Sequence, residues 1–175
     1  MSAAEEAGEH VHHAQEPFDK VVAGTMAIVA AVLAIVSVLG LHLISEKLLN
    51  QQKSSDQWSY YQAKNIRRYS AQVARDLLTQ ANAGAEVTGK YAKDMARYDE
   101  DMKGITEKAK EYEKERDVDG QRAERLHTGE VFLEVAIVLS SLAILTKRKL
   151  WYIAGTVSAL IGLVVAATGF VYPPV

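Results

Sequence analysis

Cysteine is absent from this chain of 175 residues, and its three prolines stand at Pro17, Pro173 and Pro174. The missing cysteines exclude a disulfide framework, a thiolate nucleophile and a cysteine-ligated zinc or iron–sulfur site. No proline interrupts the long interior of the chain, so nothing there forbids very long helices. The formal net charge of −2 gives no support for nucleic-acid binding. A mean hydropathy of −0.07 describes an ordinary soluble chain, but this average conceals an uneven distribution.

Charge is missing from two long runs. Val21–Ser45 and Leu150–Val175 contain no Asp, Glu, Lys or Arg. About 20 mostly apolar residues cross a bilayer as a helix. A third, shorter run, 131–146, is interrupted only by Glu134 and is followed by a basic turn at 147–149. We therefore predict transmembrane helices over 21–45, 131–146 and 150–172. The first is too long and its leader too acidic for a cleaved signal peptide.

The leader, residues 1–20, carries five acidic residues and one basic residue, which predicts a disordered tail. It contains three closely spaced histidines that could bind a transition metal weakly. An incidental cluster on a disordered tail is the reading we favour, and we predict no metal site and no cofactor. The three histidines are His10, His12 and His13.

Charged residues concentrate in 46–130, which holds 16 basic and 16 acidic side chains. Its second half has mostly apolar or aromatic residues at alternating spacings of four and three, the pattern of a coiled-coil seam. These seam positions are Tyr91, Met95, Tyr98, Met102, Ile105, Ala109, Tyr112, Arg116, Asp119, Ala123 and Leu126. A looser seam in the first half comprises Leu48, Gln52, Ser55, Gln62, Ile66, Tyr69 and Val73. The stretch between them with turn chemistry is 82–89.

The predicted fold is therefore an all-α membrane protein. Three transmembrane helices carry a long antiparallel coiled-coil hairpin, which is inserted between the first and second of them. A turn centred near residue 86 would place Arg116 opposite Asp56 and Asp119 opposite Lys53. We predict interhelical ion pairs there, which would select the register more than they stabilise the fold. The alternative is that these charges are simply solvated.

Small residues recur at helical spacing in all three predicted spans. Membrane helices pack by close backbone approach at small residues, so these stripes predict a compact bundle or contacts between protomers. The stripes are Ala23, Ala27, Ala30, Ala34 and Ser37; Ala136, Ser140 and Ala143; and Gly155, Ala159, Gly162, Ala166 and Gly169.

Polar groups within apolar spans are candidates for function, and His42 and Glu134 are such groups, with Glu130 just outside. The predicted register places His42 opposite Glu130 and about one turn from Glu134. A His–carboxylate pair of this kind near the membrane surface could form a proton-responsive lock. The alternative that we favour is a plain interfacial pair that stabilises the base of the hairpin.

The orientation follows from the basic residues. The turn at 147–149 favours the cytoplasm and so places the hairpin outside it. Basic residues near the hairpin base argue for the reverse, but long loops count for less, and we predict an extracytoplasmic hairpin. The opposing residues are Lys47, Lys53, Arg122 and Arg125.

The segment 55–67, SDQWSYYQAKNIR, resembles a bacterial membrane-protein family known as domain of unknown function number 4337. The stretches 16–19 and 115–117 and the segment 136–148 share the resemblance. It implies an inner-membrane (cytoplasmic membrane), multi-pass protein with three spans and a helical insert, and it implies no activity.

In that motif, Trp58 and Tyr61 can fill the seam against Tyr112. The residues then expected to face outward combine aromatic and basic side chains, which are typical of protein interfaces. The alternative is that they only solvate the helix. This predicted interaction face consists of Tyr60, Lys64, Arg67 and Arg68.

No nucleophile elbow, P-loop, paired-carboxylate cleft or metal-ligand set appears, so we predict that the chain is not an enzyme. The leading hypothesis is a membrane-anchored scaffold in contact with lipid that forms a homo-oligomer or docks a protein partner through the hairpin. The alternative is an accessory subunit of a transporter, channel or pH sensor that uses His42 and Glu134.

Overall fold

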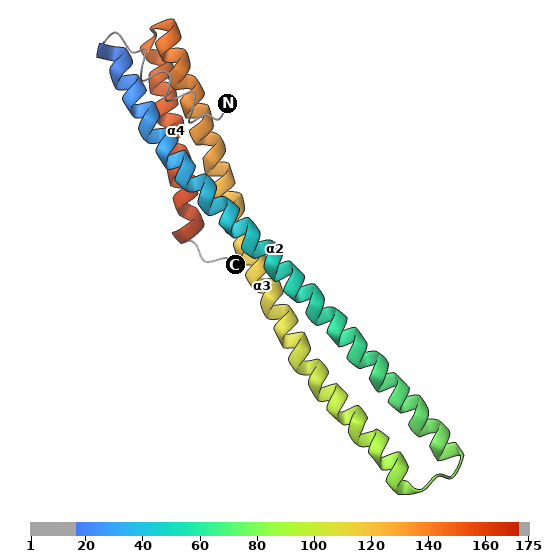
Figure 1. The fold of residues 1–175 in the computed structure, drawn as a ribbon. Helices are drawn as coiled ribbons and strands as arrows, with labels where there is room; N and C mark the ends of the chain where they lie inside the picture. The colour runs from blue at the N-terminus through green and yellow to red at the C-terminus, as the bar shows by residue number, and fades with distance from the viewer. Residues whose placement is uncertain (1–16, 172–175) are drawn as a thin grey trace. The chain divides into compact units, whose positions relative to one another are not determined.

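A computed structural model of the chain describes residues 17–171, which form three α-helices (Figure 1). They are α2 (Pro17–Gln80), α3 (Ala85–Thr146) and α4 (Lys149–Val171). The all-helical class is confirmed for this part of the chain. Each helix contains a segment long and apolar enough to cross a membrane, which is the composition of a membrane protein. The histidines His10, His12 and His13 lie outside the described residues, as does most of the predicted leader.

Helix α2 begins earlier than predicted. Residues 17–20, assigned from sequence to the disordered leader, form its first turn. Pro17 suits the first helical position, where its missing N–H has no intrahelical partner to lose. Asp19 lies in this first turn, where a carboxylate is favoured by the helix dipole.

The turn between α2 and α3 is shorter than the predicted 82–89. Asn82 adopts a left-handed conformation with φ of 54°. Its N–H donates to the carbonyl of Thr79, and the N–H of Ala83 donates to the carbonyl of Leu78. This pair of bonds is the Schellman arrangement that ends a helix, with Asn in the position that glycine usually takes. Because α3 resumes at Ala85, the two helices pair about one turn away from the predicted register.

A second tight turn joins α3 to α4. Lys147 is also left-handed, with φ of 55°, and its ammonium group pairs with the carboxylate of Asp19. Lys149, predicted as part of the turn, is the first residue of α4. The turn and the start of α2 are thus tied together by one ion pair.

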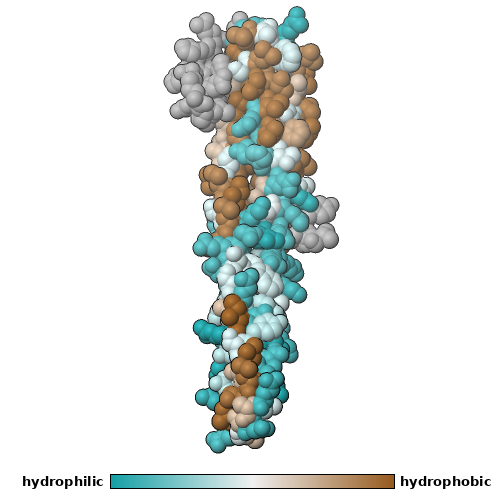
Figure 2. Space-filling view, turned by 90° about the vertical axis from the view of Figure 1, so that its right-hand side faces the viewer, coloured by the Kyte–Doolittle hydropathy of each residue, from teal (hydrophilic) through white to brown (hydrophobic). Residues whose placement is uncertain are grey.

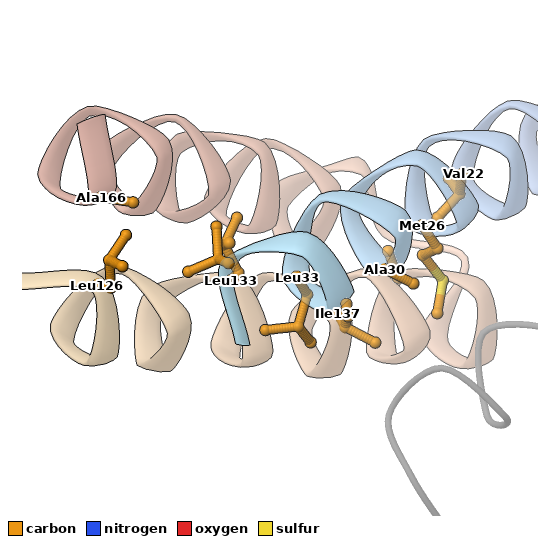
Figure 3. Packing of buried hydrophobic residues seen from close by; sticks show 10 residues of the cluster. Val22, Met26, Ala30, Leu33, Leu126, Leu133, Ile137 and Ala166 are labelled. Carbon is orange, nitrogen blue, oxygen red and sulfur yellow. The ribbon is translucent and has the colours of Figure 1, made fainter. Parts of the chain in front are cut away.

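The chain divides into two compact units, and each is described by itself. The three-helix unit comprises residues 17–46 and 117–171 of the described chain, and the hairpin unit comprises 47–116. In the three-helix unit, apolar side chains of α2 and α3 pack against each other, and Ala166 of α4 belongs to the same cluster, near Leu126 (Figure 3). The buried members of this core are Val22, Met26, Ala30, Leu33, Val36, Leu126, Leu133, Ile137, Ala143 and Ala166.

Helices α3 and α4 approach so closely that their backbones nearly touch. A Cβ atom built on Gly129 would lie 2.7 Å from the carbonyl oxygen of Gly162, and one on Gly162 would lie 2.8 Å from that of Gly129. A Cβ on Gly155 would lie 2.9 Å from Oγ of Ser140. The small-residue stripes of 136–143 and 155–169 therefore face each other, as close packing requires. The stripe in α2 is confirmed only in part, because Ala27 and Ala34 are exposed.

In the hairpin unit, α2 and α3 lie antiparallel on either side of the turn at 81–84 (Figure 1). The predicted seam of α3 faces inward, with Met102, Ile105 and Ala109 buried. Helix α2 meets this seam with a different face from the predicted one.

Candidate functional sites

The inner face of α2 in the hairpin unit is largely polar. Its most buried members are Asn50, Ser54 and Ala71, at 4%, 2% and 8% exposure. These residues recur at helical spacing, so they mark the line along which α2 rests on α3. A polar contact line is retained only if its groups are hydrogen-bonded or paired.

Two ion pairs hold the distal part of this line. Nζ of Lys64 lies 2.7 Å from Oδ2 of Asp101, and Nε of Arg68 lies 2.5 Å from Oδ1 of Asp99. The hydrogen bond to Asp101 raises the pKa of Lys64 above its ordinary value of 10.5. Nζ of Lys64 also lies 5.5 Å from the ring centre of Tyr98, a cation–π distance. Two of the basic side chains of α2 are thus drawn inward onto α3.

Glu113 organises the proximal part of the line. Its carboxylate accepts a hydrogen bond of 2.8 Å from Nε1 of Trp58 and a longer one of 3.4 Å from Oγ of Ser54. Trp58 packs edge-on against Tyr61 at 5.8 Å. Trp58 and Tyr61 thus lie partly buried, as predicted, but Tyr112 lies beneath Nζ of Lys53, at 5.4 Å.

The register inferred from the sequence is wrong by about one helical turn. Nη1 of Arg116 donates to Oε1 of Gln51 at 2.8 Å, and Gln51 precedes the predicted partner Asp56 by more than a turn. The displacement follows from the turn, which closes before residue 86. The ion pairs Asp56–Arg116 and Lys53–Asp119 stay predictions, now less favoured by the register.

The outer face of α2 carries the apolar residues of the predicted seam, and Leu77 lies next to them on the same side. We call Ile66, Tyr69, Val73 and Leu77 the outer stripe. Their exposed fractions are 66%, 56%, 58% and 62%. Figure 2 shows hydrophobic side chains aligned along the hairpin unit, bordered by hydrophilic ones. Every member of the predicted seam of α2 is exposed, namely Leu48, Gln52, Ser55, Gln62, Ile66, Tyr69 and Val73. The inward ion pairs of Lys64 and Arg68 set this rotation.

The predicted interaction face is therefore divided. Tyr60 and Arg67 are exposed, as expected. Lys64 and Arg68 point instead toward α3, where aspartates hold them. The spacing of apolar residues in α2 correctly indicated that they share one side of the helix. The prediction that this side faces α3 was wrong, because the residues are exposed.

The polar groups of the three-helix unit form a different constellation from the predicted one. Glu130 accepts a hydrogen bond from Oγ of Ser37, and its second oxygen lies 3.3 Å from Nδ1 of His127. His42 and Glu134 are both exposed, and within residues 17–171 neither has a hydrogen bond or ion pair. The histidine beside Glu130 is thus His127, which precedes it by three residues on α3, and not His42.

Helix α4 is fixed at its C-terminal end by a basic residue of α3. Nη1 of Arg125 donates to the carbonyl oxygen of Thr168 at 3.3 Å, a favourable contact at the negative end of a helix. The apolar end of α4 thus packs beside a charged part of α3.

Within residues 17–171, no group of three His, Asp, Glu or Cys side chains is placed to hold a metal ion.

An apolar groove of about 220 Å³ lies between α2 and α4. Its lining includes Val29 of α2, Leu133 and Ser140 of α3, and Leu160 of α4. The hydroxyl of Thr156 at its edge is already bonded to the carbonyl of Tyr152. The groove therefore offers shape and apolar surface, but few free polar groups.

A family model described as a domain of unknown function (DUF4337) matches residues 18–172. No curated protein and no solved structure showed significant similarity to the chain. The match covers the three helices and both turns.

Proposed function

The chain belongs to the family of domain of unknown function DUF4337, and from this premise we propose that it is a membrane-anchored scaffold without catalytic activity. In this proposal the apolar segments of all three helices cross the inner membrane. The hairpin unit is a coiled coil on the extracytoplasmic side that binds protein. The observation that carries the proposal is the outer stripe, four exposed apolar side chains on one side of α2, separated by three, four and four residues, outside the apolar segments.

An exposed apolar line of this kind indicates a binding surface. Isolated exposed apolar residues are common, but a contiguous line bordered by polar residues is typical of interaction sites. A helix can bind another helix through residues spaced at i, i+3, i+7 and i+11, which is the spacing of the outer stripe. In the three-helix unit, lipid would cover the exposed apolar side chains. In the hairpin unit, the surface of a bound protein would cover the outer stripe.

The experiment is purification in a gentle detergent, followed by mass measurement of the intact assembly. The scaffold proposal expects the chain in a complex that the double substitution Ile66→Glu and Val73→Glu removes. The matched control is Lys103→Glu, on an exposed position of α3, which should leave the complex unchanged. A monomer without any partner, in wild type and variants alike, would contradict the proposal.

The orientation has its own test, which the absence of native cysteine makes simple. Ala83→Cys places one thiol in the turn between α2 and α3. In intact cells, an extracytoplasmic hairpin predicts labelling by a membrane-impermeant thiol reagent before lysis. Labelling only after lysis would place the hairpin in the cytoplasm.

A second candidate function, a proton-responsive accessory subunit, is favoured by one contact. Glu130 joins Ser37 of α2 to His127 of α3, so its protonation would alter a link between two helices. Glu130→Gln and His127→Gln should then change a pH response while the assembly stays intact. Loss of the assembly alone would favour the scaffold.

A further inference from the structure

In an ordinary soluble hairpin, a helix packs its apolar side against its partner and exposes its polar side. Helix α2 of the hairpin unit has the opposite arrangement. Ion-paired and hydrogen-bonded side chains lie against α3, while the outer stripe faces away. Rotating α2 to bury the stripe would expose the paired charges, so the structure holds the apolar line outside. We infer that this line is the contact surface for α2 of a second copy of the chain, with the two helices parallel.

The face is free of charge along its whole length. Successive residues of a helix turn by about 100°, which places one continuous line from Leu48 to Leu77 on the outer side. The line reads Leu48, Gln52, Ser55, Ser59, Gln62, Ile66, Tyr69, Val73 and Leu77, and all nine are exposed. Lys64 and Arg68 point to α3, and Arg67 lies about 100° further round the helix.

This uncharged line matches a copy of itself. Two chains anchored through the same segments share one orientation in the membrane. Each outer residue then meets its own counterpart across a two-fold axis, as in isologous dimers. Serines and glutamines would face each other in the proximal part, and aliphatic and aromatic side chains in the distal part. No like charges oppose each other along the line, whereas a strongly charged partner would find no complement there.

Membrane anchoring favours this contact. A soluble dimer without such an anchor usually has to bury about 800 Å² on each partner to be stable. Confinement to one bilayer raises the effective concentration of the second copy and converts a weak contact into a populated one. The inference rests on the proposed interaction role and names the partner within it.

The test uses single-cysteine variants of the full chain in lipid vesicles, oxidised at several ratios of lipid to protein. Val73→Cys and Ile66→Cys should form covalent dimers. Ala71→Cys, which faces α3 at 8% exposure, and Lys103→Cys, on the exposed side of α3, should not. Equal dimer formation at Lys103→Cys, or none at the stripe positions, would overturn the inference.

A second variant separates the two proposals. Ile66→Glu added to Val73→Cys should reduce the covalent dimer by roughly tenfold or more, because opposed like charges at an interface are costly. If the chain forms a complex with a different protein and stripe cysteines never link two copies, the scaffold proposal survives and this inference fails. If neither complex nor crosslink forms, both fail.

Discussion

The three-helix unit and the hairpin unit both expose apolar side chains, but for different reasons. In the three-helix unit, Ile28, Ile35 and Leu160 are well exposed around helices held together by glycine contacts. In the hairpin unit, the exposed residues Ile66, Tyr69, Val73 and Leu77 form one line, and ion pairs and hydrogen bonds join the two helices. The first pattern suits a lipid environment on all sides, and the second suits one partner on one side.

The comparison teaches that apolar periodicity does not by itself identify what covers a helix face. Gly129, Gly155 and Gly162 mark where α3 and α4 touch, because a Cβ atom there would lie 3.0 Å or less from an atom of the other helix. Ion pairs identify which way a polar helix is rotated. The two units therefore differ in which substitutions they tolerate, and substitutions can test the difference.

The largest effect is expected where the backbones of α3 and α4 touch. Gly129→Ala or Gly162→Ala would place a methyl group within 2.8 Å of a carbonyl oxygen that cannot move without shifting its helix. Overpacking of this kind costs about 1–3 kcal/mol of unfolding free energy. Gly24→Ala, which meets nothing within 4 Å, should be neutral or slightly stabilising. Denaturant titration in micelles measures all three, and equal responses would mean that the close contact is absent.

A smaller effect is expected at the ion pair between Arg68 and Asp99. Arg68→Asp should destabilise the hairpin unit by about 1 kcal/mol, the range of partly exposed pairs, and Asp99→Arg added to it should restore most of the loss. The measurement is thermal unfolding followed by helical circular dichroism. The same exchange between Asp56 and Arg116 should show no such rescue. Rescue at Asp56 and Arg116 instead would restore the register expected from the sequence.

The smallest effect is the pH response of Lys64. Its pKa is raised in the folded chain by the bond to Asp101, so its stabilising contribution is complete below its ordinary pKa of 10.5. That contribution is lost as the pH rises through the raised folded value. The melting temperatures of wild type and Lys64→Gln should therefore differ at neutral pH and converge only as the pH rises through the raised pKa of Lys64. A constant difference would show that the pair with Asp101 does not form.

The three helices were predicted well from the sequence. So were the contact face of α3 in the hairpin unit and the contact face of α4 in the three-helix unit. The seam of α3 was correct because an apolar or aromatic residue occupies every seam position from Tyr91 to Tyr112. The stripe of α4 was correct because glycine has few other uses in an apolar helix. The rotation of α2 was not predictable from periodicity, since Ile66 and Val73 satisfy a seam on either side. Ser37 was missed as a partner of Glu130 because the turn ends at Gly84 and shifts the pairing of α2 with α3. His127 lies three residues before Glu130 on the same helix, and this spacing was the signal that could have found it.

The central claim is that α2 rests on α3 through its polar face, and two neighbouring serines test it directly. Ser54 is 2% exposed and contacts Glu113, whereas Ser55 is exposed and belongs to the seam predicted from the sequence. Each is replaced by cysteine together with Glu113→Cys, and a short thiol crosslinker is applied to the full chain. The structure predicts fast crosslinking within one chain for Ser54→Cys and little for Ser55→Cys. Faster crosslinking for Ser55→Cys would contradict it, because the apolar line of α2 would then lie inside the hairpin.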